Sequence, residues 1–261
     1  MDRRNIEKIA HTSEDRYLLA KLWDKINSGI NKNIMANTSF LSPREQEMAR
    51  YLFGEFEGLD YFGGYEYSER RMLIYLPDYL TEDSLYDEES PVVCLRAKFY
   101  ENDELSHRDF LGALMGSGIE RECVGDILVG KGSCDFFVTR EMTNYIMQNF
   151  ISAGRTKISL TEIPIKEASV PVAEVKEIKD TLASLRLDAV ISSGFRVGRN
   201  LAAQYIEGGK VQINGLPTEK PDKQVSQGVK ISVRGLGKIL LREVNGQTKK
   251  GRISVIIERY I

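Results

Sequence analysis

Apolar residues in the first part of the chain recur at the spacing of an amphipathic helix. The segment 13–30, SEDRYLLAKLWDKINSGI, has this period, and Ser13 is its expected N-cap. We therefore expect one long helix here, with an apolar side formed by Leu18, Leu19, Leu22, Trp23 and Ile26.

A second helix is expected in the sequence LSPREQEMARYLFGEF. Ser42 can cap it, Pro43 would occupy its first position, and Glu45 can support its first turn. The chain then turns through two glycines into a strand that begins near Met72. We therefore predict a mainly helical domain over 1–80, followed by an acidic surface loop, TEDSLYDEES, at the domain boundary.

The next segment alternates between strand and helix patterns in the order βαββαβ. That order is the ferredoxin-like arrangement that many RNA-recognition domains share. We therefore predict an RRM-like, RNA-binding domain over 81–165. Its strands are expected at 91–100, 124–129, 134–139 and 157–163, and its helices at 107–118 and 140–154.

This predicted sheet offers a few residues that suit RNA. Arg96 and Lys98 would point away from the apolar residues of the first strand, and Phe137 could stack on a base. The alternative is that another domain covers Phe137. The sequence GKGS joins two strands and lacks the spacing of a phosphate loop, so it predicts a hairpin turn with Lys131 at its tip, able to touch RNA.

The segment from Ile163 to Asp180 has Pro164, Pro171 and alternating charges, which predict a connector with a short strand over 166–181. Two short helices follow, of which the first would end at Gly194 in a left-handed conformation and the second would begin near Gly198. Alternating strands then flank an Asn-Gly turn. We predict a domain over 182–261, in which a helix pair lies on a small sheet that ends in a β-hairpin. The whole chain is thus expected to be α+β.

Composition limits the class of protein. The chain has 261 residues, of which 42% are hydrophobic and 28% charged, as is typical of soluble globular proteins. No apolar run is long enough to span a bilayer, and the charged start does not resemble a signal peptide. Three scattered cysteines and two histidines lack the spacing of a metal site. We expect a cytoplasmic protein without a membrane span, metal or cofactor.

Charge is distributed unevenly along the chain. From Thr181 onward there are 14 Lys and Arg against 6 Asp and Glu, whereas the preceding part has 22 against 32. A basic C-terminal part indicates a polyanionic partner. Arg196 and Arg199 flank the start of the second short helix, where free amides and guanidinium groups favour phosphate. The expected RNA-binding set is Arg186, Arg196, Arg199, Asn200, Gln204, Lys210 and Arg234.

Basic residues also gather at the tip of the C-terminal hairpin. They form either a second RNA-binding patch or a solvated loop. Together with the candidates from the predicted RRM-like domain, they make up the secondary RNA-binding candidates: Arg96, Lys98, Lys131, Phe137, Lys249, Lys250 and Arg252.

The C-terminal pattern resembles the S-four (S4) RNA-binding domain, which is named after a small-subunit ribosomal protein. Gly198 replaces the usual serine before the arginine, and Val229 replaces a frequent aspartate, but neither change alters the expected fold. The resemblance implies that Arg186, Arg199 and Asn200 contact RNA. It rests on Arg186-Leu187-Asp188, Gly194-Phe195, Arg199, the sequence GKVQING at 209–215, Pro221, Gly228 and the sequence VRG at 233–235.

Four further segments are similar to the YlmH family of bacterial proteins: LSPREQ, GGYEYSERR, LSHRDFLGALMGSGIERECVGDI and LASLRLDAVIS. This resemblance implies a helical N-terminal domain, a middle RNA-binding domain and a C-terminal S4 domain. It also implies binding to ribosomal RNA and peptidyl-tRNA on the large ribosomal subunit, in the rescue of stalled ribosomes. The name of the family comes from a gene neighbourhood linked to cell division.

Two other functions stay open. Pseudouridine synthases also contain an Arg-Leu-Asp motif, whose aspartate attacks the base, but Asp188 lies within the S4 helix pattern and is expected to pair with an arginine. An RNA-modifying enzyme is one alternative, and a cell-division scaffold with a protein partner on residues 1–80 is the other. The leading expectation is a non-catalytic monomer that binds ribosomal RNA, with tRNA as a second candidate partner.

Overall fold

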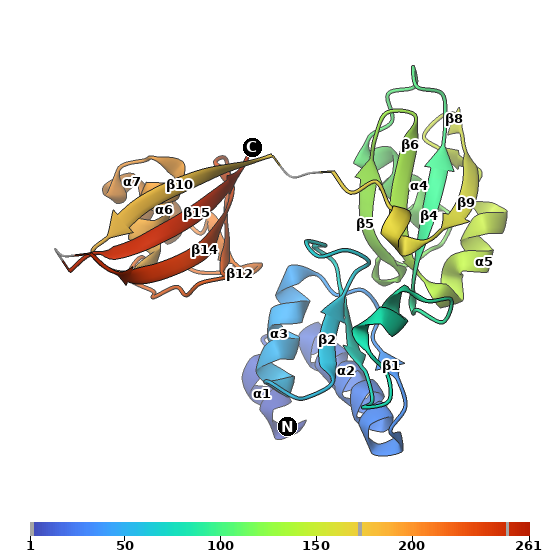
Figure 1. Ribbon diagram of the computed structural model, residues 1–261, viewed down its shortest axis with the longest axis horizontal. Helices are drawn as coiled ribbons and strands as arrows, with labels where there is room; N and C mark the ends of the chain where they lie inside the picture. Colours follow the sequence, from blue (N-terminus) through green and yellow to red (C-terminus); the bar gives the residue numbers. More distant parts are fainter. Residues whose placement is uncertain (1–2, 172–173, 249–250) are drawn as a thin grey trace. The chain divides into compact units, whose positions relative to one another are not determined.

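The computed structural model describes residues 3–171, 174–248 and 251–261, which form two compact units (Figure 1). The first unit spans Met1–Pro171 and the second Val172–Ile261. Both units mix helices and strands, so the α+β class predicted from the sequence is confirmed.

Helices begin the first unit. The capping predicted for α3 is confirmed, because Ser42 Oγ accepts from the Glu45 N–H and the Glu45 carboxylate accepts from the Ser42 N–H. The prediction for α2 was wrong by one residue: its N-cap is Thr12, whose Oγ1 accepts from the Asp15 N–H, and Ser13 is the first helical residue. The bounds are η1 (Arg3–Asn5), α1 (Ile6–Ile9), α2 (Ser13–Lys32) and α3 (Pro43–Phe53).

A small antiparallel sheet completes this first part, in the order β1-β3-β2. Its strands are β1 (Ala36–Asn37), β2 (Leu59–Phe62) and β3 (Met72–Tyr75). Only β3 was predicted: β1 has two residues and shows no alternation, and β2 directly precedes the two glycines at which the sequence indicated a turn. The acidic segment was expected to be a surface loop, but it forms the 3-10 turn η2 (Glu82–Tyr86) and buries Leu85.

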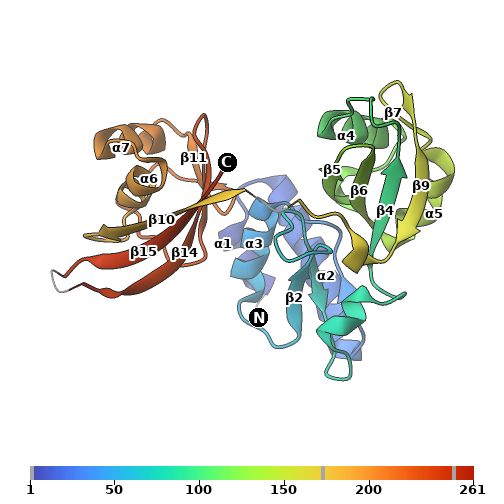
Figure 2. The same ribbon diagram turned by 45° about the horizontal axis from the view of Figure 1, so that its top comes forward.

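A four-stranded antiparallel sheet forms the rest of the first unit, in the order β5-β6-β4-β9. This strand order and the two helices confirm the predicted βαββαβ arrangement. Both helices pack on one face of the sheet, where Phe110 and Leu114 of α4 and Ile146 of α5 join its core (Figure 2). The bounds are β4 (Val92–Lys98), α4 (His107–Gly116), η3 (Arg121–Cys123), β5 (Val124–Val129), β6 (Ser133–Thr139), α5 (Arg140–Asn149) and β9 (Ser159–Ile163).

Helix α5 is shorter than predicted. It was expected to reach Gly154, but it ends at Asn149, and Gly154 instead turns a small hairpin with φ 57°. That hairpin joins β7 (Ser152–Ala153) to β8 (Thr156–Lys157).

The opposite face of the four-stranded sheet is covered by other parts of the same unit. The ring of Phe137 on β6 is fully buried, 5.5 Å from the ring of Tyr65 and in one core with Phe40. Gly64 lies so close to this ring that an added Cβ would come within 2.3 Å of it. The segment after β9, which includes η4 (Ile165–Glu167), adds Ile165 to the same core. The face that RRM-type domains use for RNA is therefore closed in this protein.

The second unit is a six-stranded antiparallel sheet with α6 and α7 on one face (Figure 2). Its strand order is β10-β15-β14-β13-β11-β12. Strand β10 lies mostly in the segment predicted as a connector with a short strand, and it pairs with β15 along its whole length. The bounds are β10 (Val175–Leu182), α6 (Leu187–Phe195), α7 (Arg199–Glu207), β11 (Val211–Ile213), β12 (Leu216–Pro217), β13 (Lys230–Val233), β14 (Gly237–Gln247) and β15 (Ile253–Tyr260).

The end of α6 differs from the prediction. Gly194 lies inside the helix, and the left-handed residue that ends it is Arg196, with φ 55°. A Cβ on Gly194 would lie 2.7 Å from Ile239 Cδ1 and 3.2 Å from Ile257 Cγ2. This glycine therefore serves the close packing of α6 on the sheet and not the helix end.

Candidate nucleic-acid interface

The site is centred on one buried carboxylate, Asp188 in the first turn of α6. Arg186, the N-cap residue of α6, donates to its two oxygens at 3.2 and 3.1 Å. Arg199, the first residue of α7, donates to Oδ1 at 3.1 Å, and its Nε lies in ion-pair contact with Oδ2, also at 3.1 Å. The side chain of Asp188 is 7% exposed, whereas those of Arg186 and Arg199 are 36% and 52% exposed. One buried acid thus holds two arginines that still reach solvent.

The electrostatics of this trio favour the charged form of the acid. Burial of Asp188 acts to raise its pKa, but the hydrogen bonds from Arg186 and Arg199 outweigh burial and leave the pKa below its ordinary value. The pKa of Arg186 is raised, chiefly by its hydrogen bond to Asp188. Three charges share the site and two are positive, so it keeps a net positive charge that an anion can neutralise.

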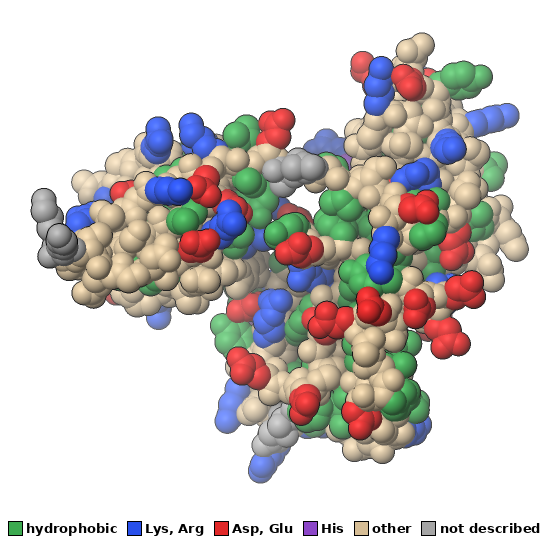
Figure 3. Space-filling model, viewed as in Figure 1, with side chains coloured by type: hydrophobic (Ala, Val, Ile, Leu, Met, Phe, Trp, Pro, Cys, Tyr) green, Lys and Arg blue, Asp and Glu red, His purple; other side chains and the backbone are tan. Residues whose placement is uncertain are grey.

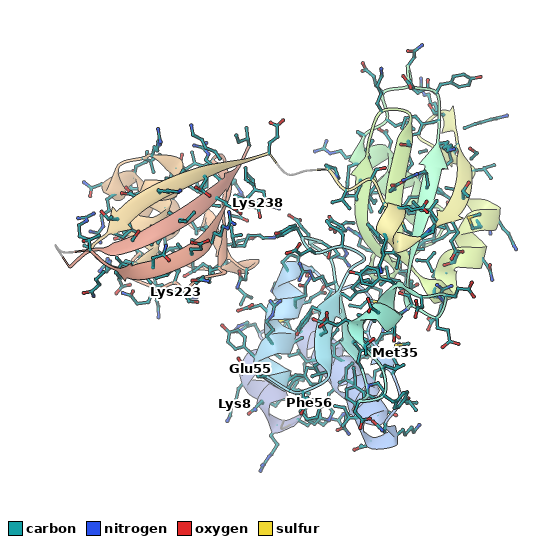
Figure 4. The ribbon with its side chains drawn as sticks, in the orientation of Figure 1. Lys8, Met35, Glu55, Phe56, Lys223 and Lys238 are labelled. Carbon is teal, nitrogen blue, oxygen red and sulfur yellow. The ribbon has the colours of Figure 1, made fainter. Side chains whose placement is uncertain are left out.

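Backbone contacts fix the start of α6. The Leu187 N–H donates to the Lys223 carbonyl, and the Asp188 N–H donates to the Pro221 carbonyl, both within 3.0 Å. The free amides of this helix start are thereby satisfied by protein and not by a ligand. The side chain of Lys223 lies at the surface of the unit (Figure 4).

The start of α7 is more open. Its N-cap is Gly198, which offers no side-chain cap, and Gly198, Arg199 and Asn200 are all exposed. This is the arrangement of amides and guanidinium predicted from the sequence, and it suits a phosphate group. Figure 3 shows Lys and Arg side chains on the visible face of the second unit, with fewer acidic side chains among them.

The remaining members of the expected RNA-binding set lie on α7 and beyond its C-terminal end. Gln204 is exposed on this helix, and Lys210 follows it with its Nζ 5.4 Å from the Tyr205 ring. Arg234 is a neighbour of Lys210, because its N–H donates to the Lys210 carbonyl at 2.9 Å. Lys210 lies three residues beyond the last residue of α7, a helix of nine residues that is about 13 Å long. The set therefore forms two groups, one at each end of α7.

Two secondary candidates in the first unit are corrected by the structure. Phe137 cannot stack on a base, because its ring is fully buried. The guanidinium of Arg96 is held by the buried Asp135 at 2.6 and 2.7 Å and also donates to Ser169 Oγ, so its Nε and Nη2 donors are used within the unit.

The other secondary candidates have mixed surroundings. Lys98 is exposed, whereas Lys131 pairs with Glu101 at 3.2 Å. Lys249 and Lys250 lie outside the described residues. Arg252 donates its Nε–H to Thr181 Oγ1 at 3.0 Å and a second N–H to the Thr181 carbonyl. Sequence reasoning missed Thr181, since only the pairing of β10 with β15 brings it to Arg252.

Within the described ranges, no group of His, Cys, Asp and Glu side chains is arranged to hold a metal ion. Among those same residues, no helix combines the length and apolar character needed to cross a membrane.

Comparisons with known proteins match both units. The family model described as "Putative RNA-binding domain in YlmH" matches residues 94–167, and the model described as "S4 domain" matches residues 185–231. A Bacillus subtilis (strain 168) protein named "Ribosome-associated protein quality control protein P2" is 34% identical over 227 residues, which cover 86% of this chain and 87% of that protein. A solved structure, "Cell division protein ylmH from Streptococcus pneumoniae", aligns with 60% of this chain and 96% of that chain, at 23% identity and a TM-score of 0.47.

Proposed function

Since the chain belongs to the YlmH family, we propose that it is a non-catalytic RNA-binding protein of the bacterial large ribosomal subunit. The name of the Bacillus subtilis relative, which refers to ribosome-associated protein quality control, supports a role in the rescue of stalled ribosomes. The RNA would be ribosomal RNA, with peptidyl-tRNA as a second contact. Such a role would place the protein in the cytoplasm.

One observation carries this proposal: Asp188 holds Arg186 and Arg199 with their guanidinium groups partly exposed. Guanidinium groups form strong paired hydrogen bonds with phosphate, and arginines held in place lose less freedom when they bind. The closed sheet face of the first unit strengthens the assignment, because it leaves the second unit as the better candidate for RNA contact.

The same geometry counts against an RNA-modifying enzyme built on the Arg-Leu-Asp motif. A nucleophilic aspartate must reach the base, but the Asp188 side chain is 7% exposed and both of its oxygens accept from guanidinium groups. Its role is structural and electrostatic, and we propose no reaction at this site.

The direct test is the affinity for purified large-subunit ribosomal RNA, measured by filter binding over a series of KCl concentrations. Arg199→Ala should weaken binding by about 1 to 2 kcal/mol, or roughly 5- to 30-fold, with a shallower salt dependence. Arg242→Ala is the matched control, since Arg242 follows the buried Leu241 and pairs with Glu258 at 2.8 Å on the sheet face away from the helices.

Wild-type protein that does not bind this RNA at any salt concentration would overturn the proposed function. Equal loss of affinity in Arg199→Ala and Arg242→Ala would overturn the site, because it would indicate an effect of net charge alone.

A further inference from the structure

An open pocket of about 450 Å³ lies next to the Asp188 trio in the second unit. It is lined by β10, by the end of α6 and by the start of α7, and three arginines contribute to it: Arg196, Arg199 and Arg252. Arg196 and Arg199 come from the S4 segment, whereas Arg252 directly precedes β15 and lies outside the S4 match at 185–231. The fold thus places Arg252 in the same pocket as Arg196 and Arg199, which are close to each other in the sequence.

Strand pairing explains how Arg252 reaches the pocket. Thr181, a residue of the pocket wall, pairs with Ser254 of β15, so Arg252, two residues before Ser254, lies diagonally across from Thr181. Both described hydrogen bonds of its guanidinium go to neutral oxygens of Thr181. Among the described residues, neither Arg196 nor Arg252 has a carboxylate within ion-pair distance. The charge of these two arginines is therefore available to a ligand.

The single acidic group among the described lining residues is already occupied. Asp180 accepts from Ser193 Oγ at 2.6 Å with one carboxylate oxygen and from the Thr181 N–H at 2.7 Å with the other. Lys179 adds a further positive charge to the wall, although it pairs with Glu177 at 3.2 Å. The pocket consequently presents guanidinium and hydroxyl groups and a net positive charge, which suit an anion.

Size and lining restrict the anion further. A pocket of this volume falls in the range of about 300 to 1,000 Å³ that ligands of nucleotide size occupy, and it exceeds what a bare phosphate needs. None of the described residues that line it is aromatic, so the pocket offers no ring on which a base could stack. These features favour recognition of a sugar–phosphate backbone and not of a base.

We propose that this pocket binds one phosphodiester of the RNA chain together with its ribose, with Arg252 and Arg196 as the main phosphate contacts. The proposal rests on the proposed RNA-binding function and extends the interface from α6 and α7 to β10 and the start of β15.

Substitutions at Ala183 test the pocket without removing any existing contact. Ala183 lines the pocket and is exposed, so Ala183→Glu, Ala183→Gln and Ala183→Lys should all fold, as checked by circular dichroism. The probe is large-subunit ribosomal RNA in the filter-binding assay at moderate salt. We expect Ala183→Glu to bind about tenfold more weakly than Ala183→Gln, because a carboxylate repels phosphate, and Ala183→Lys to bind at least as tightly as Ala183→Gln.

Arg252→Ala provides a second, independent measurement. It should weaken RNA binding roughly 5- to 30-fold and reduce the slope of log affinity against log salt by about 1, as expected when one phosphate contact is lost. Arg242→Ala again serves as the matched control and should keep the wild-type slope.

The results distinguish failure of the pocket proposal from failure of the proposed RNA-binding function. If the wild type binds RNA and Arg199→Ala weakens it, but Arg252→Ala and Ala183→Glu bind like their controls, the pocket proposal is overturned and the proposed function stands. If the wild type binds no RNA, both fail together.

Competition distinguishes an RNA phosphate from a free one. Inorganic phosphate and AMP are added at an ionic strength matched with chloride. We expect neither to displace the RNA, since one phosphate lacks the contacts that the RNA chain makes outside the pocket, such as the contact at Arg186. Displacement of the RNA by either compound, abolished in Arg252→Ala, would show a site for free phosphate and contradict the assignment to the RNA backbone.

Discussion

Arg199, the first residue of α7, donates a hydrogen bond of 3.1 Å to Asp188 Oδ1, in the first turn of α6, and its Nε lies 3.1 Å from Oδ2 in the same ion pair. This pair joins the starts of the two helices and fixes the direction of an arginine that is otherwise half exposed. Arg186, two residues before Asp188 in the sequence, donates to both oxygens of the same carboxylate. The geometry makes Asp188 a positioning residue for both arginines.

Asp188→Asn separates positioning from net charge. The substitution raises the local charge by one unit, so simple electrostatics predicts tighter RNA binding. We expect instead a loss of about 1 kcal/mol, or roughly fivefold, because Arg186 and Arg199 lose their charged partner and become mobile. Filter binding with large-subunit ribosomal RNA measures the effect.

The control for this substitution is Asp222→Asn, since Asp222 is exposed and its charge also acts on Arg186. It adds the same charge without disturbing the trio and should not weaken binding. Asp188→Asn protein that binds RNA as tightly as Asp222→Asn protein would contradict the positioning role.

Phe137→Ala tests whether the sheet face of the RRM-like domain is closed. The ring is fully buried and packs against Tyr65, so its loss should destabilise the first unit by about 3 to 5 kcal/mol. RNA affinity of the folded variant should stay at the wild-type level. Urea unfolding and filter binding measure the two effects.

Tyr100→Ala is the matched aromatic control, because Tyr100 is 84% exposed and its removal should leave stability almost unchanged. If Phe137→Ala weakened RNA binding without destabilising the unit, the ring would be accessible to bases and the description of this face would be wrong.

Gly194→Ala tests the close packing of α6 on the sheet. Alanine favours a helix over glycine by about 1 kcal/mol, but here the new Cβ would lie 2.7 Å from Ile239 Cδ1 in a packed core. Overpacking should dominate and lower the stability of the second unit by about 1 to 2 kcal/mol.

Gly112→Ala is the counterpart in α4, where nothing lies within 4 Å of the added Cβ. It should stabilise the first unit by about 0.5 to 1 kcal/mol, because only the helix preference acts. Urea unfolding compares the two variants, and stabilisation by Gly194→Ala would refute the packing argument.

Asp15 gives a pH dependence to the stability of the first unit. Hydrogen bonds from Arg44 at 2.8 and 2.7 Å lower the pKa of Asp15 to about 2, while burial acts in the opposite direction. Because the folded pKa is below the ordinary value of 3.8, this stabilisation is present above about pH 4 and is lost as the pH falls toward 2. Because Arg44 is partly exposed and solvent screens the pair, we expect it to contribute about 1 kcal/mol at neutral pH.

Carboxyl NMR titration measures this pKa directly. We expect Asp15 to titrate near 2 in the wild type and closer to its ordinary value in Arg44→Ala. A wild-type value near 4 would show that the ion pair does not stabilise the fold.

Much of the fold could be predicted from local sequence signals. The capping box at Ser42, the βαββαβ order and the Asn-Gly turn depend on neighbouring residues, and the structure has all three. Gly194 shows the limit of this reasoning: a glycine near the end of a helix pattern suggests a cap, but tertiary packing against Ile239 decided its role.

The site was predicted only in part, for the same reason. The arginines of the S4 motif and their pairing with Asp188 follow from residues close in sequence. The contact of Arg252 with Thr181 depends on strand pairing across the unit, and the burial of Phe137 depends on residues far from it, such as Phe40. The residues next to Arg252 and Phe137 in the sequence do not predict this contact or this burial.

The central claim is that the arginines held by Asp188 bind the large ribosomal subunit. Co-sedimentation of the purified protein with ribosomal subunits at low and high salt tests it, with wild type, Arg199→Ala and the control Arg242→Ala compared. Arg199→Ala keeps Arg186 as a partner for Asp188, so the buried acid stays paired. We predict that wild type and Arg242→Ala migrate with the large subunit at low salt and are released at high salt, whereas Arg199→Ala migrates weakly. Wild-type protein that stays at the top of the gradient, or Arg199→Ala protein that migrates as fully as wild type, would contradict the account.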